Sequence, residues 1–258
     1  MIRFFRRIRQ RFLREGAFSK YLLYAVGEIA LVVIGILLAL AINNANQAGI
    51  TRQKEQVYLK GLHGDFSASK AKLEELISVN RQNYGGAREI ADLMYRTDSL
   101  PSEEDFSALL FQAFAYDIAF NPNNALLDEM ISSGSLKDLS NVNLRWQLTN
   151  WKAFLDDVAK QEADLRKQRE KLLDLFQNGD YSIRLLFDQA GISETVMGLK
   201  PREQVKSNLH VLQSPVMENG LMSFILTSIL TETEHYQPLM EELDAILLTV
   251  AEEIEEEN

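Results

Sequence analysis

The sequence predicts an all-α protein in which one N-terminal transmembrane helix is followed by an antiparallel helical bundle. The first observation is an apolar stretch, Tyr21 to Ile42, that contains a single ionisable side chain, Glu28, and no proline. The second is a set of long segments with apolar residues at heptad spacing, and the third is that no strand-like alternation is found. We therefore expect a basic segment 1–20, a span 21–42 and an acidic helical domain 43–258.

Residues 1–20 form a basic segment that we expect to lie at the membrane surface. It holds seven Lys and Arg side chains against one Glu. Apolar side chains recur between the arginines at helical spacing, which is typical of an interfacial amphipathic helix. A role as a topology signal alone is an equally good interpretation. The residues predicted to contact the membrane surface are Arg3, Phe4, Phe5, Arg6, Arg7 and Phe12.

The apolar stretch 21–42 is predicted to be one transmembrane helix. At about 1.5 Å per residue its 22 residues reach roughly 33 Å, close to the ~30 Å hydrocarbon core of a bilayer. A cleaved signal peptide is the alternative, because Ala39-Leu40-Ala41 has the small-x-small pattern of a cleavage site. The long basic lead and the length of the apolar run favour an uncleaved anchor.

The flanking charges predict the orientation and the compartment. A Lys/Arg excess before the first span keeps that end in the cytoplasm. Residues 43–258 hold 20 basic and 35 acidic side chains and are expected on the far side, which is the periplasm for a bacterial inner-membrane protein. The acidic domain argues against nucleic-acid binding, which needs a basic face. The lipid bilayer is the first predicted partner.

One face of the span carries small residues that are predicted to contact another helix. Gly35-x-x-x-Ala39 permits close helix–helix approach, and Gly27 and Glu28 border the same face. A carboxyl group inside a membrane is costly, so Glu28 either stays neutral, reaches the interface or bonds across a helix contact. We favour the last of these, in a homo-oligomer or with another membrane protein.

Residues Phe18 to Asn44, FSKYLLYAVGEIALVVIGILLALAINN, resemble the opening of a family of uncharacterised single-span bacterial membrane proteins whose domain has no known function. A later Ser-Gly-x-Leu segment of that family is similar to residues 133–136 here. Where the family usually has Asn-Asn-Trp-Asn, this chain has Asn-Asn-Ala-Asn at 43–46, so it lacks the interfacial Trp. The resemblance implies a membrane anchor with a helical outer domain and implies no activity.

The first half of the outer domain is predicted to contain three helical segments. Residues 46–94 form one helix or two in tandem, with a bend expected at Gly85-Gly86. Ser102 is the predicted start of a helix over 103–119. A turn at 121–124 precedes a short helix over 125–132, closed by Gly134. The first of these segments has the seam Leu59, Leu62, Phe66, Ser69, Leu73, Leu76 and Asn80.

A second heptad segment predicts the other long helix of the bundle. Its seam keeps four–three spacing through Leu144, Leu148, Trp151, Leu155, Val158, Glu162, Leu165, Arg169, Leu172 and Phe176. Glu162 and Arg169 are charged, and we expect both to reach past the seam to water. Selection of a register or a partner is the alternative. Further helices are predicted over 181–190, 202–210, 220–230 and after Pro238, followed by a solvated acidic end.

The chain offers little chemistry. It has no cysteine, which excludes thiol catalysis, zinc–thiolate sites and disulfides. His63, His210 and His235 are isolated, and His235 with Glu232 and Glu234 is better explained as a surface His on an acidic helix than as a metal site. We expect no metal, no cofactor and no catalytic residue.

These patterns favour a non-enzymatic, membrane-anchored helical interaction or scaffold protein that self-associates through its span and its bundle. One alternative is a subunit of an oligomeric channel or transport complex with Glu28 in the membrane. Another is a ligand sensor, which must signal through a partner because 20 residues before the span are too few for an output domain.

Overall fold

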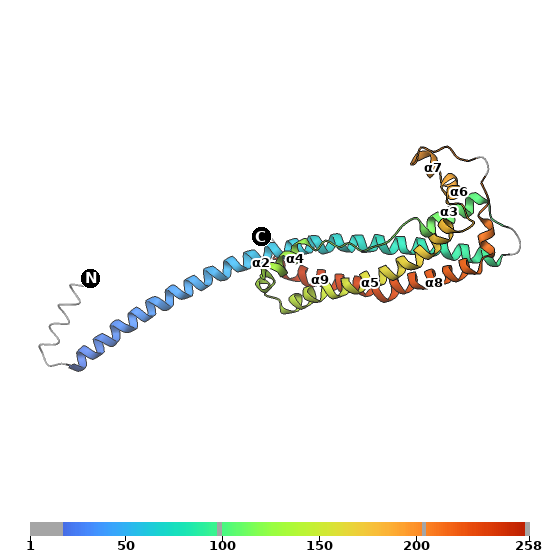
Figure 1. The fold of residues 1–258 in the computed structure, drawn as a ribbon. Coiled ribbons are helices and arrows are strands. Elements are labelled where there is room, and N and C mark those ends of the chain that lie inside the picture. Colours follow the sequence, from blue (N-terminus) through green and yellow to red (C-terminus); the bar gives the residue numbers. More distant parts are fainter. Residues whose placement is uncertain (1–17, 97–99, 203–204, 256–258) are drawn as a thin grey trace. The chain divides into compact units, whose positions relative to one another are not determined.

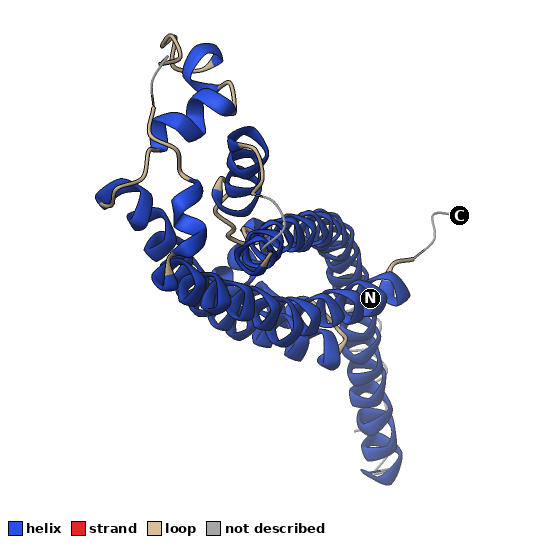
Figure 2. Cartoon of the chain, turned by 90° about the vertical axis from the view of Figure 1, so that its right-hand side faces the viewer, coloured by secondary structure: helices blue, strands red, loops and turns tan. Residues whose placement is uncertain are grey.

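A computed structural model describes residues 18–96, 100–202 and 205–255, with side chains from Leu22 onward. Within these ranges the regular secondary structure is all helical, with no strand, as Figures 1 and 2 show. The predicted all-α class, with a long apolar N-terminal helix before a helical bundle, is therefore confirmed. The chain divides into two compact units, Met1–Glu55 and Gln56–Asn258.

The first unit contains the start of the longest helix, α2 (Phe18–Tyr95). The apolar stretch predicted to be a span lies in this part of α2, and its large apolar side chains from Leu22 to Ile42 are exposed. Among the described residues α2 is the one helix long and apolar enough to cross a membrane. Within the part of the chain that the structure describes, none of this window is buried.

The second unit is a bundle of four columns. The first column is the part of α2 after Glu55. The second is α3 (Glu103–Phe114), a non-helical connection, α4 (Ala125–Ser133) and the 3₁₀ turn η1 (Ser135–Asp138). The third is α5 (Val142–Asn178). The fourth is α8 (Pro215–Thr231), the π-helical turn η3 (Glu232–Tyr236) and α9 (Gln237–Glu253). The three short elements that link the third column to the fourth are α6 (Ile183–Gln189), α7 (Ile192–Thr195) and η2 (Leu209–Gln213).

Hydrogen bonds between distant residues show that neighbouring columns are antiparallel. As the residue number rises along α5, the residue number of its contact in the fourth column falls, so the two columns run antiparallel. The three contacts are Asn141 with Glu253, Gln161 with Thr231, and Leu172 with Gly220. Along α2, Lys70 bonds Asp244 and Asn80 bonds the Ser228 carbonyl, in the same descending order. The second column also descends along α2: Gly86 packs on α3, Lys72 bonds Asn121 and Gly61 meets Leu126. The result is the up–down–up–down arrangement of a helical bundle.

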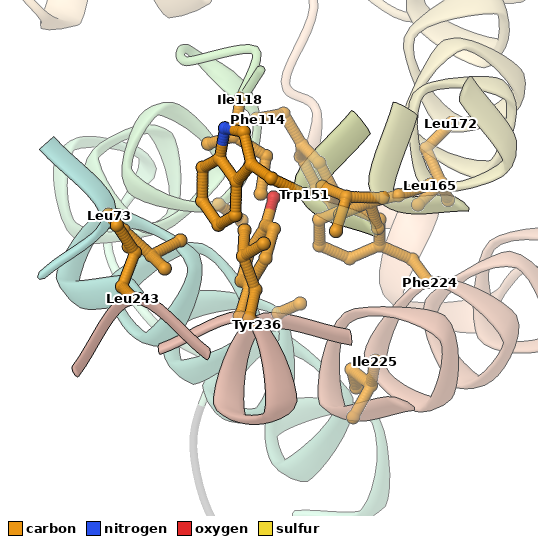
Figure 3. Packing of buried hydrophobic residues seen from close by; sticks show 14 of the residues in the cluster. Leu73, Phe114, Ile118, Trp151, Leu165, Leu172, Phe224, Ile225, Tyr236 and Leu243 are labelled. Atoms are coloured by element: carbon orange, nitrogen blue, oxygen red, sulfur yellow. The ribbon is translucent and has the colours of Figure 1, made fainter. Parts of the chain in front are cut away.

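The predicted heptad seams form most of the core. Every seam residue predicted over 59–80 is buried except the half-buried Leu76, and in α5 only Leu155 and Arg169 are half-buried. The centre is aromatic: the rings of Phe66 and Trp151 lie 5.2 Å apart, and those of Phe114 and Phe224 lie 5.3 Å apart. Figure 3 shows Trp151, Phe224 and Tyr236 converging from the third and fourth columns. Such ring pairs add to the stabilisation that burial itself provides.

The helix ends follow the capping residues of the sequence. Ser102, Asn141 and Ser214 each accept a hydrogen bond from a backbone N–H in the first turn, which satisfies a group that the helix leaves open. Gly134 adopts φ 71°, the left-handed conformation that ends α4, as predicted.

Two details of the predicted elements are wrong. The helix expected over 103–119 ends at Phe114. Side chains of α2 and α5 donate to the backbone carbonyls at 114–116 instead. The helix expected over 202–210 is absent from the described residues there, which hold only the 3₁₀ turn from Leu209. Residues 46–94 lie in one continuous helix, α2, and the bend expected at Gly85-Gly86 stays a prediction. A Cβ on Gly86 would lie 3.2 Å from the Ala113 nitrogen, so Gly86 permits close contact with α3.

Candidate functional site

The candidate site is the non-helical connection of the second column, residues 115–124, which lies between α2 and α5. A chain segment without helical hydrogen bonds must find other partners for its buried N–H and C=O groups. Here side chains provide them. The connection begins at Ala115, which is the C-cap of α3, and ends at Asn124 before α4.

A row of charged side chains on α5 holds one side of the connection. Arg169 donates from Nε to the Phe114 carbonyl at 2.9 Å, at the C-terminus of α3 where a cation is favourable. One turn earlier Arg166 pairs with Asp117 at 2.7 Å. Glu162 accepts a hydrogen bond from the Phe120 N–H at 2.8 Å. The spacing of 162, 166 and 169 places these side chains on one face of α5.

Side chains of α2 hold the other side of the connection. The Ser69 hydroxyl accepts from the Asn123 N–H at 2.8 Å, and Lys72 donates to the Asn121 carbonyl at 3.0 Å. Asn83 donates to the Tyr116 carbonyl at 3.3 Å. The connection is thus fixed by long helices on both sides, so its residues form a defined surface rather than a free loop.

Glu162 is the central charged group of this site. It is only 5 % exposed, and its Oε1 also accepts a hydrogen bond from the Tyr236 hydroxyl at 2.7 Å. Burial raises the pKa of the Glu162 carboxyl, and the bonds from Tyr236 and Phe120 oppose that rise. Burial also raises the pKa of Tyr236, with a further contribution from the neighbouring carboxylate, so Tyr236 stays a hydrogen-bond donor.

The π-helical turn η3 positions Tyr236. A π turn widens the helix by one residue, and such turns are frequent at functional sites. Pro238 lies two residues after Tyr236 and has no N–H to donate to a carbonyl of the preceding turn, which is one reason for the irregular helix here. Within the turn Glu232 pairs with Arg81 at 2.5 Å, and His235 contacts Asp157 at 2.9 Å. These bonds tie the turn to α2 and α5 and hold the Tyr236 hydroxyl against Glu162.

A cavity of about 680 Å³ opens between the connection and α5. Its described lining includes the carboxyl groups of Asp65, Asp128, Asp156 and Glu162, and no Lys, Arg or His. The other lining residues are Phe120, Asn121, Pro122, Asn123, Asn124, Ala125, Leu155, Val158 and Ala159. The cavity is therefore acidic with partly apolar walls, and it borders the buried carboxyl.

A smaller cavity of about 310 Å³ lies at the other end of the connection, among α3, α5 and α6. Its lining is mainly apolar, with Phe111, Phe114, Phe176 and Phe187 among the residues. The guanidinium of Arg169 also lines it, but two of its nitrogens already donate to the last carbonyls of α3.

The residues predicted to form a helix contact in the membrane lie apart from this site. Gly27, Glu28, Gly35 and Ala39 are exposed on α2, and a Cβ added to Gly27 or Gly35 would meet no atom within 4 Å. The contact predicted for them stays a prediction. The residues predicted at the membrane surface, Arg3, Phe4, Phe5, Arg6, Arg7 and Phe12, lie outside the described part of the chain.

The prediction that both charged seam residues reach past the seam to water is wrong. Glu162 is buried, and the half-buried Arg169 is bonded to α3, because the non-helical connection presents backbone groups that both side chains satisfy. Sequence reasoning missed Tyr236 and Phe120 as partners. The sequence did hold one indication of such partners, namely a charged residue at a seam position of a strict heptad pattern.

The three histidines are separate in the structure. His63 and His210 are exposed, with His210 stacked on Tyr181 at 4.7 Å, and His235 contacts a single carboxylate. In the described residues no group of three or more His, Asp or Glu side chains is arranged to hold a metal ion.

Comparison with known families matches residues 28–160 to a family of unknown function, DUF6090. The chain belongs to this family. The match covers α2 from Glu28 onward, the second column and the first half of α5. The connection 115–124 therefore lies within the DUF6090 region, whereas Glu162 and Tyr236 lie beyond it. No curated protein matches the chain, and no solved structure does.

Proposed function

We propose that this DUF6090 protein is a membrane-anchored helical interaction protein that self-associates through the apolar part of α2 and through its bundle. The observation that carries the proposal is the exposure of the large aliphatic side chains between Leu22 and Ile42, none of which is buried by the described residues. An apolar surface of this size needs a cover, either lipid or another protein. In a bilayer, a helix of this length and composition is covered by lipid on most of its surface and can be covered by a second helix on the rest.

The small-residue face supports a helix contact inside the bilayer. At about 100° per residue, Gly27, Glu28, Gly35 and Ala39 fall within an arc of about 120°. Helices approach closely where residues are small, and a carboxyl that is hydrogen-bonded across a contact is less costly than one that faces lipid. The described residues leave this face open, because an added Cβ at Gly27 or Gly35 meets none of their atoms within 4 Å.

Mass measurement of the intact full chain in detergent tests self-association. Gly35→Leu combined with Glu28→Leu should lower the oligomer mass, because the first adds bulk at the contact and the second removes its polar bond. Val33→Leu is the matched control, since residue 33 lies about 160° from residue 35 around the helix. An oligomer mass that is the same in all three proteins removes the span from the interface.

The proposed orientation has its own test. Arginines at 3, 6, 7, 9, 11 and 14 favour a cytoplasmic N-terminus, with the bundle on the periplasmic side. Protease added outside spheroplasts should therefore digest the bundle, and a C-terminal phosphatase reporter should be active. A protected C-terminus, or a mature product that lacks the apolar stretch, would contradict the anchor or its direction.

A further inference from the structure

We propose that the acidic cavity between the connection 115–124 and α5 binds a small organic cation, with the ammonium group of the ligand against Glu162 and its apolar part against the cavity wall. This site is independent of self-association and of the membrane span. It assigns a ligand-binding role to the bundle.

The first argument is the state of the Glu162 carboxyl. Its side chain is 5 % exposed and lines the cavity, and both of its hydrogen bonds, from Phe120 and Tyr236, go to Oε1. Oε2 has no hydrogen-bond partner among the described residues. A buried carboxylate is costly unless its lone pairs are satisfied or an opposite charge is close. The charge of Arg166 already favours the ionised carboxyl, and an ammonium group in the cavity adds a direct partner for Oε2.

The second argument is the charge around the cavity. Asp65, Asp156 and Glu162 form no ion pair in the described chain, and only Asp128 is paired, with Lys152 at 3.2 Å. No described lining residue is basic. Acidic walls of low dielectric concentrate a negative potential inside a cleft, which attracts cations and disfavours anions.

The third argument separates an organic cation from a metal ion. A metal ion requires several ligands at short distances, and no cluster of three or more suitable side chains exists in the described residues. The volume of about 680 Å³ is in the range of small-molecule sites. Phe120, Leu155 and Val158 give the cavity an apolar side, so a cation with a short apolar or aromatic chain fits it better than a hydrated ion.

Tryptophan fluorescence offers a local probe of this site. Trp151 is 1 % exposed and its indole N–H donates to the Asn124 side chain at 3.0 Å, and Asn124 lines the cavity. The chain has one other tryptophan, Trp146, which is 62 % exposed. Trp146→Phe in the full chain therefore isolates the signal of Trp151, with zwitterionic nanodiscs holding the apolar helix.

The experiment titrates this protein with 2-phenylethylammonium and, separately, with the neutral 2-phenylethanol. We expect a saturable change in Trp151 emission with the cation and a much weaker one with the alcohol. Glu162→Gln should lower the affinity for the cation by about tenfold or more, because it removes the charge that the ligand pairs with. Glu242→Gln is the matched control: it removes another carboxyl whose pKa burial raises, away from the cavity, and should leave binding unchanged.

Three results would overturn the proposal: no saturable change with the cation, an equal response to the alcohol, or an unchanged affinity in Glu162→Gln. Circular dichroism checks that Glu162→Gln is folded. If it is not, Asp156→Asn decides, because Asp156 is exposed and forms no bond that the fold needs. It should weaken binding about two- to fivefold, and equal affinity in that variant then rejects the site.

Discussion

The bond between Glu162 and the backbone of Phe120 predicts a large difference between two substitutions at one position. Glu162→Leu removes the acceptor of two buried donors, the Phe120 N–H at 2.8 Å and the Tyr236 hydroxyl at 2.7 Å. Each donor left unpaired costs about 1–3 kcal/mol. The gain from burying leucine in place of a carboxyl, about 1–2 kcal/mol, offsets part of this. We expect a net loss of about 2–4 kcal/mol in the free energy of unfolding.

Glu162→Gln is the matched comparison. Its side-chain carbonyl replaces Oε1 and still accepts both hydrogen bonds, so only the charge assistance is lost. Charge-assisted bonds are about twice as strong as neutral ones, and the expected loss is therefore about 1 kcal/mol or less. The order of stability should be wild type, then Gln, then Leu.

Urea unfolding of the full chain, followed by tryptophan fluorescence in zwitterionic micelles, measures these differences. Hydrogen exchange at the amide of residue 120 gives a local readout, because that N–H loses its acceptor in the Leu variant and keeps it in the Gln variant. A Leu variant within about 0.5 kcal/mol of the Gln variant, with the same exchange rate, would refute the reasoning. The carboxyl would then not hold the connection.

Three further predictions follow from the same contacts. Gly86→Leu should lower the free energy of unfolding by about 1–3 kcal/mol, because a Cβ there already lies 3.2–3.3 Å from backbone atoms of α3. Gly85→Ala, with open space around it, should leave the stability measured by urea unfolding unchanged or raise it. Arg169→Met should speed hydrogen exchange in the last turn of α3, because it removes the donor to the Phe114 carbonyl. Arg166→Met is the comparison: it breaks an exposed ion pair and should change the free energy of unfolding by less than about 1 kcal/mol. Burial raises the pKa of the Glu162 carboxyl in the folded state, so the free energy of unfolding should fall as the pH rises from the pKa of this group in the unfolded chain to its pKa in the folded chain. Over that range the urea midpoint should depend less on pH in Glu162→Gln than in the wild type.

Features set by neighbouring residues were predictable. The apolar stretch, the two heptad seams and the caps at Ser102 and Gly134 each depend on spacing within one or a few helical turns. The same local reasoning extended α3 to residue 119, because the helical pattern continues there. It could not show that Arg169, 55 residues away, binds the Phe114 carbonyl and that the chain then leaves the helix.

The sequence by itself determined that this chain is helical, that its N-terminal part is apolar enough to need a cover, and that the remainder is acidic. The tertiary structure decided what its charged seam residues do. Glu162 meets the N–H of a residue 42 positions away and the hydroxyl of one 74 positions away, beside an acidic cavity. Whether a charge at a seam reaches water or satisfies buried backbone depends on which segment packs across from it, and that follows from the column order of the bundle rather than from helical periodicity.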